Sequence, residues 1–177
     1  MNEPLPAQTY DTLQAIIAYK TEYDGVSPSL DELAVAVTMV KSRLSKHISR
    51  LCKHGLLTRT PGKSRNLAVA GGQWAWAEPK TFPIGRAGDV LRIVVTYKTD
   101  YDGNAPSHRQ IAQALGLAYT GDIKTYLDEL AEGGYLATAY ATDRHIAVAG
   151  GRWNYDAAVL QAASGRVPRQ GELLPPE

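Results

Sequence analysis

Apolar residues recur at helical spacing in two stretches that each end at an Asp-Gly pair. Leu13, Ile16 and Ile17 share one face of a helix predicted over 11–23, and the same spacing repeats over 89–101. The glycine accepts the left-handed conformation that ends a helix, and the proline three residues later prevents the helix from continuing. Each stretch is therefore expected to form one amphipathic helix with a defined C-terminal end.

Two further helices are expected after each of these. A Ser-x-x-Glu pattern opens the stretch 30–37, and a Ser-x-x-Gln pattern opens 108–115. In such a capping box, two side chains satisfy free backbone N–H groups at the start of a helix. A tight turn follows, and a longer amphipathic helix begins near Ser42 in the first case and near Thr120 in the second. A glycine marks the end of each longer helix.

Short β segments follow each longer helix. Residues 56–59 and 66–69 flank a Pro-Gly turn, which suits a β-hairpin, and 135–139 and 145–148 match them. One more helix is expected over 155–164. The order helix, helix, turn, helix, hairpin predicts a fold that is mainly α with small β-hairpins (α+β), and this order occurs twice.

The sequence itself repeats. Residues 19–29 read YKTEYDGVSPS and residues 97–107 read YKTDYDGNAPS, identical at eight of eleven positions. The correspondence continues to a shared Arg-x-x-Ala-Val-Ala-Gly-Gly segment, so the repeat is nearly eighty residues long. A period of this length predicts two domains with separate cores rather than a solenoid. The expected parts of the 177-residue chain are domain 1 (1–78), a linker (79–86), domain 2 (87–155), and a short helix with a flexible tail (156–177).

Four aromatic residues lie close to the expected linker or just after the second hairpin. They are Trp74, Trp76, Phe82 and Trp153. We expect them to pack between the domains, and the two prolines of the linker to restrict how the domains are oriented.

Both copies share further motifs. These are G-x-x-P-S-x-x-[EQ]-[LI]-A, then [IL]-x-x-L-x-x-x-G, and a hairpin that ends in R-x-[LI]-x-V. The combination resembles the N-terminal winged helix-turn-helix domain of LexA-type repressors, and the second copy matches its spacing better. The resemblance implies that the third helix enters the DNA major groove and that the hairpin, or wing, lies along the backbone. No counterpart of the protease domain of such repressors is found, so self-cleavage is not expected.

Charge separates the two copies. The formal net charge is only +1, but residues 41–65 contain eight Lys or Arg and no acid. Residues 119–144 contain two basic and five acidic residues, a balance of −3. The two copies therefore present opposite electrostatic potentials to a partner.

The basic third helix is the main candidate for contact with DNA. When Leu44, Ile48 and Leu51 face the core, short hydroxyls and long cations point outward, a combination suited to a helix that approaches a groove closely. The predicted DNA-binding residues on this helix and its wing are Lys41, Ser42, Arg43, Ser45, Lys46, Ser49, Arg50, Lys53, Arg59, Lys63 and Arg65.

The third helix of the second copy is acidic and is expected to face protein, with a weaker contact to DNA as the alternative. Its candidate residues are Tyr119, Thr120, Asp122, Lys124, Thr125, Asp128, Glu129 and Glu132. Two protein contacts fit this pattern. The acidic helix meets the basic one, within the chain or in a second copy, or domain 2 forms a homodimer that places two first domains on a palindrome.

Other chemistry is not indicated. No apolar run is long enough to cross a membrane, and the single cysteine, Cys52, allows neither an internal disulfide nor a cysteine-based zinc site. The N-terminus does not resemble a secretion signal, so a cytoplasmic protein is expected. No phosphate-binding loop, metal cluster or paired carboxylates are recognisable, and no enzyme activity, cofactor or small-molecule ligand is expected.

The sequence therefore predicts a DNA-binding regulator of transcription, repressor-like and of prokaryotic or phage origin, whose partners are double-stranded DNA and further copies of itself. A DNA-binding protein of plasmid or phage replication or partition is one alternative. The other is a winged-helix module that binds only proteins.

Overall fold

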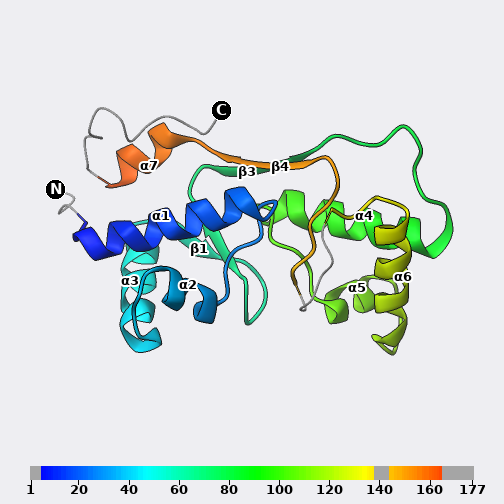
Figure 1. The fold of residues 1–177 in the computed structure, drawn as a ribbon, viewed down its shortest axis with the longest axis horizontal. Coiled ribbons are helices and arrows are strands. Elements are labelled where there is room, and N and C mark those ends of the chain that lie inside the picture. Colours follow the sequence, from blue (N-terminus) through cyan, green and yellow to red (C-terminus); the bar gives the residue numbers. More distant parts are fainter. Residues whose placement is uncertain (1–4, 138–143, 165–177) are drawn as a thin grey trace.

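The computed structural model describes residues 5–137 and 144–164. These residues form a helix-rich α+β fold with two small antiparallel sheets (Figure 1). In chain order the elements are α1 (Ala7–Glu22), α2 (Leu30–Ala36), α3 (Lys41–Lys53), β1 (Leu57–Arg59), β2 (Leu67–Val69), β3 (Gly72–Trp76), α4 (Gly85–Asp100), α5 (His108–Ala114), α6 (Gly121–Glu132), β4 (Gly151–Tyr155) and α7 (Ala157–Ser164). We call α1 to β3 the first half and α4 to β4 the second half.

The predicted helices are all present, but α1 and α4 begin earlier than expected. Helix α1 starts at Ala7 rather than near residue 11, and α4 starts at Gly85 rather than near residue 89. The added first turns bury Thr9 in α1 and Ala87 with Gly88 in α4. Threonine, alanine and glycine contribute little to a hydrophobic pattern, so the sequence did not reveal these turns.

Helices α2 and α5 confirm the predicted capping boxes. The hydroxyl of Ser29 accepts from the backbone N–H of Glu32, and the Glu32 side chain accepts from the backbone N–H of Ser29. Ser107 and Gln110 make the same pair of contacts in the second half. Both short helices therefore begin where the sequence predicts.

The first predicted hairpin is confirmed as β1 paired with β2, with Leu57 opposite Val69. In the second half, an isolated bridge joins Leu136 to Val148. The predicted strand over 135–139 ends outside the described residues, because these resume only at residue 144.

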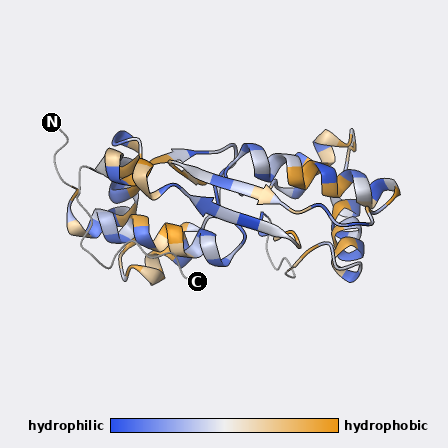
Figure 2. Cartoon of the chain, turned by 90° about the horizontal axis from the view of Figure 1, so that it is seen from above, coloured by the Kyte–Doolittle hydropathy of each residue, from blue (hydrophilic) through white to orange (hydrophobic). Residues whose placement is uncertain are grey.

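Strands β3 and β4 were not predicted. They pair antiparallel with Trp74 opposite Trp153, and they run side by side across the middle of the molecule between helices at either end (Figure 2). Each strand begins with glycine and buries only its central tryptophan, so alternation is hard to see in the sequence. Each strand also depends on a partner strand whose residues lie 75 to 83 positions away.

The buried faces of the third helices agree with the sequence pattern. Leu44, Ile48 and Leu51 are fully buried on α3, which packs against α1 and α2. The equivalent residues of α6 are also buried, and α6 packs against α4 and α5 in the same way. No described helix is both long enough and apolar enough to cross a membrane.

Candidate nucleic-acid interface and the contact between the halves

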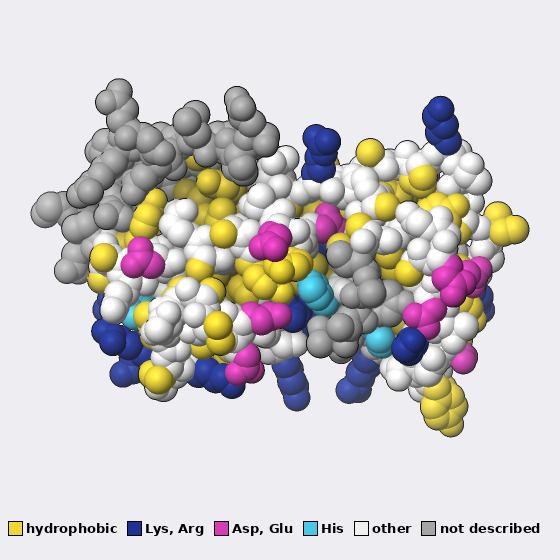
Figure 3. Space-filling view, in the orientation of Figure 1, with side chains coloured by type: hydrophobic (Ala, Val, Ile, Leu, Met, Phe, Trp, Pro, Cys, Tyr) yellow, Lys and Arg dark blue, Asp and Glu magenta, His cyan; other side chains and the backbone are white. Residues whose placement is uncertain are grey.

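The outward face of α3 carries the predicted cations. Of the eleven predicted DNA-binding residues, nine are exposed, namely Lys41, Ser42, Arg43, Lys46, Ser49, Arg50, Lys53, Arg59 and Lys63. Ser45 is half-buried, and only Arg65 is buried. The side chains of Lys and Arg gather in Figure 3 at the end of the molecule that Figure 1 assigns to α3.

Helix α3 is held to α1 by polar contacts along one edge. The guanidinium of Arg43 donates to the Gln8 side chain at 2.8 Å, and Nδ1 of His47 lies 2.8 Å from the Thr9 hydroxyl. Partial burial, with a smaller effect of nearby Arg43 and Arg50, lowers the pKa of His47. His47 is therefore neutral at pH 7 and acts as a packing partner rather than a cation.

An open hollow of about 390 Å³ lies against this helix, lined by Ser42, Arg43, Lys46, His47 and Arg50. Three of its five lining residues are Lys or Arg, and none is acidic. Because the side chains are exposed and no carboxylate neutralises the hollow, it favours an anion such as a phosphate group.

Arg65 is not part of this surface, although it was predicted to contact DNA from the wing. Its side chain is bound inside the protein, donating to the Glu32 carboxylate at 2.8 Å and to the Tyr19 hydroxyl at 2.9 Å. The equivalent Arg144 donates to Gln110 at 2.7 Å and also to the Pro61 carbonyl of the first hairpin at 2.9 Å. Arg65 thus anchors the base of the first hairpin, and the charge pattern did not distinguish it from a surface cation.

The acidic helix lies at the other end of the long axis (Figure 1). Its residues Asp122, Glu129 and Glu132 are exposed, together with Thr120 and Thr125. The ammonium of Lys124 pairs with half-buried Asp128 at 2.7 Å. Tyr119, just before the helix, is 82% exposed. A contact between α3 and α6 of the same chain is therefore not seen.

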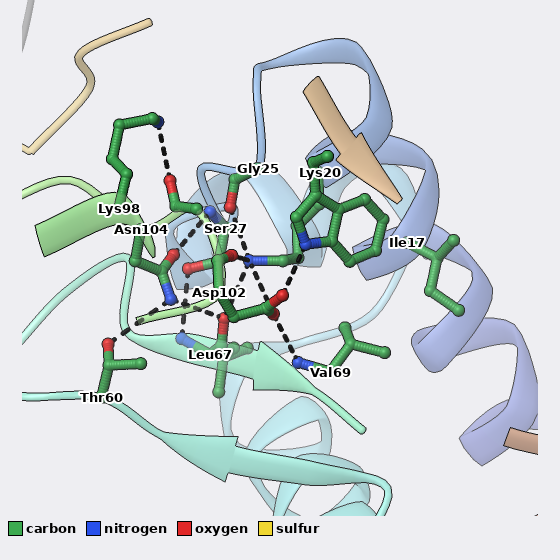
Figure 4. Close-up of polar contacts among 12 residues, drawn as sticks. Ile17, Lys20, Gly25, Ser27, Thr60, Leu67, Val69, Lys98, Asp102 and Asn104 are labelled. Atoms are coloured by element: carbon green, nitrogen blue, oxygen red, sulfur yellow. Dashed lines mark hydrogen bonds and ion pairs between the residues drawn. The ribbon is translucent and has the colours of Figure 1, made fainter. Parts of the chain in front are cut away.

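Buried polar contacts also join the two halves, and they are reciprocal. The Lys20 ammonium is 3.2 Å from the Asp102 carboxylate and donates to the Asp102 carbonyl at 2.8 Å (Figure 4). In the opposite direction, the Lys98 ammonium is 3.2 Å from the Asp24 carboxylate and donates to the Asp24 carbonyl at 2.9 Å. Each lysine thus binds the aspartate of the other half, and the two contacts are equivalent in the repeat.

The same two carboxylates also receive tryptophan. The indole N–H of Trp74 donates to Asp24 at 2.6 Å, and that of Trp153 donates to Asp102 at 2.5 Å. The Lys20 ammonium lies 5.3 Å from the centre of the Trp153 ring, and Lys98 lies at the same distance from Trp74. Trp74 and Trp153 lie opposite each other in the β3–β4 pair, so both tryptophans lie where the two halves meet.

Both lysines remain charged at neutral pH in spite of complete burial. Burial lowers the pKa of Lys20 and of Lys98 to about 8, and the facing carboxylate limits the fall in each case. Since this pKa lies above 7, the two ion pairs are present under neutral conditions. Each ammonium is also satisfied by backbone carbonyls, which a buried charge requires.

The motif Asp-Gly has a second role that the sequence alone did not indicate. Asp24 and Asp102 were interpreted as turn residues, and they do have positive φ angles of 51° and 54°. Their side chains, however, reach across to the other half. The only sequence signal for this was the identity of the motif in both copies, which turn formation alone does not require.

A buried amide of the second half also departs from reciprocity. Asn104 stands where the first half has Val26. Its amide accepts from the backbone N–H of Ser27 at 3.0 Å and donates to the Leu67 carbonyl at 2.8 Å (Figure 4). Asn104 therefore adds further bonds to the first half that Val26 cannot return.

Comparison with known proteins gives similarity to LexA repressors. The chain is 33% identical over 90 residues to LexA repressor 2 of Xanthomonas axonopodis pv. citri, which covers 49% of this chain and 41% of that protein. It is 36% identical over 89 residues to LexA repressor 2 of Xanthomonas campestris pv. campestris, with the same coverage. The LexA repressor of Magnetococcus marinus is 26% identical over 84 residues, or 48% of this chain and 34% of that protein.

The chain thus spans less than half the length of these relatives. No family model and no solved structure matches it. The similarity supports a LexA-like DNA-binding domain and extends over about half the chain.

Metal chemistry has no support in the described residues. Across 5–137 and 144–164, no three His, Cys, Asp or Glu side chains come together as a metal site would need. The candidate functional sites among the described residues are the basic face of α3 and the contact between the halves.

Proposed function

We propose that this chain is a DNA-binding regulator of transcription, built from two winged-helix units in tandem, in which the first unit makes the main contact with DNA. The observation that carries the proposal is the surface of α3 and the first hairpin. Seven of the eight cations in residues 41–65 are exposed there, and no acid interrupts them. In a winged helix these are the elements that meet the major groove and the backbone.

The similarity to LexA repressors supports the same conclusion, because those proteins are repressors by name and match about half of the chain. The tandem arrangement is supported by the repeated sequence and by the reciprocal contacts of Lys20 and Lys98. We assign α6 to contact with protein, since Asp122, Glu129 and Glu132 would repel phosphates in a groove. A weaker contact with DNA through Thr120 and Lys124 is the alternative for this helix.

The test is binding of the full chain to duplexes selected from a random library, measured by fluorescence anisotropy at several salt concentrations. The logarithm of the association constant should fall with the logarithm of salt, with a slope of about −0.9 for each phosphate contacted. Arg50→Glu should weaken binding at least about tenfold, because it removes one cation and adds a repulsive charge to the same surface. A flat salt response would count against DNA binding.

The matched control is Glu129→Gln, at the position equivalent to Arg50 in the second half. Both residues are exposed, so neither change should disturb the core. Glu129→Gln should leave DNA affinity within about twofold if the first half carries the contact. An equal loss from both variants would contradict the assignment of DNA binding to α3.

A further inference from the structure

Helices α3 and α6 carry charges that complement each other position by position. Helix α3 has five cations and no acid, whereas α6 has four acids and one cation. At three equivalent positions of the repeat the sign reverses, with Arg43, Arg50 and Lys53 in α3 and Asp122, Glu129 and Glu132 in α6. All six side chains are exposed.

Most of these charges have no ionic partner among the described residues. Among the described residues, Asp122, Glu129 and Glu132 form no ion pair, and neither do Lys46, Arg50 and Lys53. Of the four acids of α6, Asp128 is the one with a described ion pair, and its partner Lys124 lies in the same helix. The opposite charges of α3 and α6 therefore remain available to an external partner.

The placement of the helices excludes mutual neutralisation inside one chain and leaves both open to a second chain. They lie at opposite ends of the long axis, and the paired strands β3 and β4 tie the halves together between them (Figure 1). A contact of α3 with α6 must then come from another copy. Such a contact joins two different surfaces and leaves one of each free, so it is head-to-tail.

When the two helices lie antiparallel, cations of α3 and acids of α6 fall at matching positions along the helix axes. If Arg43 lies level with Glu132, then Lys46 lies level with Glu129 and Lys53 lies level with Asp122, because each pair of residue numbers has the same sum. The three cations fall within less than a quarter of the helix circumference at 100° per residue, and so do the three acids. Antiparallel helix dipoles add a favourable interaction.

A second observation, independent of charge, also indicates a protein partner at these helices. A large apolar side chain is exposed to solvent ahead of each helix, Val40 directly before α3 at 68% exposure and Tyr119 two residues before α6 at 82%. These two positions are equivalent in the repeat. In the antiparallel arrangement each would lie beside the C-terminal end of the opposing helix, where part of its apolar surface would be covered.

We propose that the acidic face of α6 docks on the basic face of α3 of a second copy, so that the protein associates head-to-tail and conceals the α3 surface from DNA. This deepens the protein-contact role proposed for α6 and uses on α3 the surface proposed for DNA. The interface is a single pair of helices with polar faces, so the association is weak and sensitive to salt. DNA and a second copy then compete for one surface. A higher protein concentration therefore lowers the fraction of chains whose α3 surface is free to bind DNA.

The first measurement is sedimentation velocity of the full chain, without DNA, over a range of concentrations. Concentration-dependent association is expected at about 50 mM salt and its loss at about 500 mM, where charges are screened over a few ångströms. Lys46→Glu and Glu129→Lys should each weaken association at least about tenfold, since each places like charges opposite one another. The double variant should restore association, because the pair is then reversed rather than broken.

Mixing the two single variants is the sharper test. The Lys46→Glu chain keeps a native α6, and the Glu129→Lys chain keeps a native α3. An equimolar mixture should therefore associate more strongly than either variant alone, because the two native surfaces complement each other and so do the two altered ones. Absence of association at low salt, association unaffected by either variant, or a mixture that stays monomeric would each overturn the proposal.

A DNA arm separates this inference from the proposed function. Glu129→Lys should bind DNA at least as tightly as the unaltered chain, and at high protein concentration more tightly, because the competing contact is gone. If no variant binds DNA but association follows the charge-reversal pattern, the proposed function fails and the docking contact stands. If DNA binding is normal and association is absent, the inference fails alone.

Discussion

The residues that join the two halves have kept the same chemistry, whereas the third helices have opposite chemistry. Lys20 and Lys98, with Asp24 and Asp102, make the same contacts in both directions at distances equal within 0.1 Å. Arg50 and Glu129, by contrast, occupy equivalent exposed positions with opposite charge. The residues named at the contact between the halves are thus identical in the two parts of the repeat, whereas those on the exposed faces of α3 and α6 differ in charge.

The difference has a physical basis. A buried lysine needs its carboxylate and its carbonyls, and loss of either partner leaves an uncompensated charge in the protein interior. The constraint applies in both directions, and each carboxylate has several contacts to satisfy. Asp102, for example, binds Lys20, Trp153 and the backbone N–H of Val69 at once. An exposed helix position makes no such demand and tolerates a reversal of charge at small cost to stability.

The largest expected effect comes from removing one of the shared carboxylates. Asp102→Ala should lower the free energy of unfolding by about 3–5 kcal/mol, because it leaves the Lys20 ammonium buried beside an apolar side chain. Asp24→Ala should cost a similar amount through Lys98, and urea denaturation measures both. Asp89→Ala, which removes only an exposed pair with Arg86 at 4.0 Å, should cost less than about 1 kcal/mol. Unequal losses at Asp24 and Asp102 would show that the contacts are not energetically reciprocal.

A smaller effect is expected where the halves touch through glycine. A Cβ atom on Gly25, at φ +80°, would lie 2.8 Å from the Cα of Gly103, so Gly25→Ala combines backbone strain with a clash between the halves. Gly55→Ala meets nothing within 4 Å at φ +71° and isolates the strain. We expect a loss of about 1 kcal/mol for Gly55→Ala and about 1–3 kcal/mol more for Gly25→Ala, measured by thermal or urea unfolding. Equal losses would argue against close contact at Gly25.

The smallest expected effect is a difference in acid sensitivity between the contacts of the two buried arginines. Arg65 faces the Glu32 carboxylate, whereas Arg144 faces the neutral amide of Gln110. Partial burial raises the pKa of Glu32, but hydrogen bonds from Arg65 and Ser29 outweigh it and lower the pKa to about 2. Because the folded pKa is depressed, this stabilisation is present above the ordinary value of 4.5 and is lost as pH falls toward 2.

An acid titration followed by circular dichroism tests this contrast. Glu32→Gln should remove part of the stability loss between about pH 4.5 and 2, and Gln110→Glu should add a similar loss to the second half. An unchanged acid profile in both variants would mean that neither contact changes between the folded and unfolded states.

Most of the secondary structure followed from local sequence signals. The capping boxes at Ser29 and Ser107, and the buried triad Leu44, Ile48 and Leu51, depend on residues within one or two helical turns of each other. Such signals are complete within a short segment, so they can be recognised without knowledge of the fold. The early starts of α1 and α4 were missed because small residues fill their first turns.

The sequence by itself determined the repeat, the order of the elements and the opposite charges of α3 and α6, since each of these is a property of neighbouring residues or of aligned copies. Only the tertiary structure decided that β3 pairs with β4, that Arg65 is buried against Glu32, and that Lys20 reaches Asp102. These contacts join residues 33 to 83 positions apart. Whether a cation faces solvent or a carboxylate depends on which segments the fold brings together, and no local pattern carries that information.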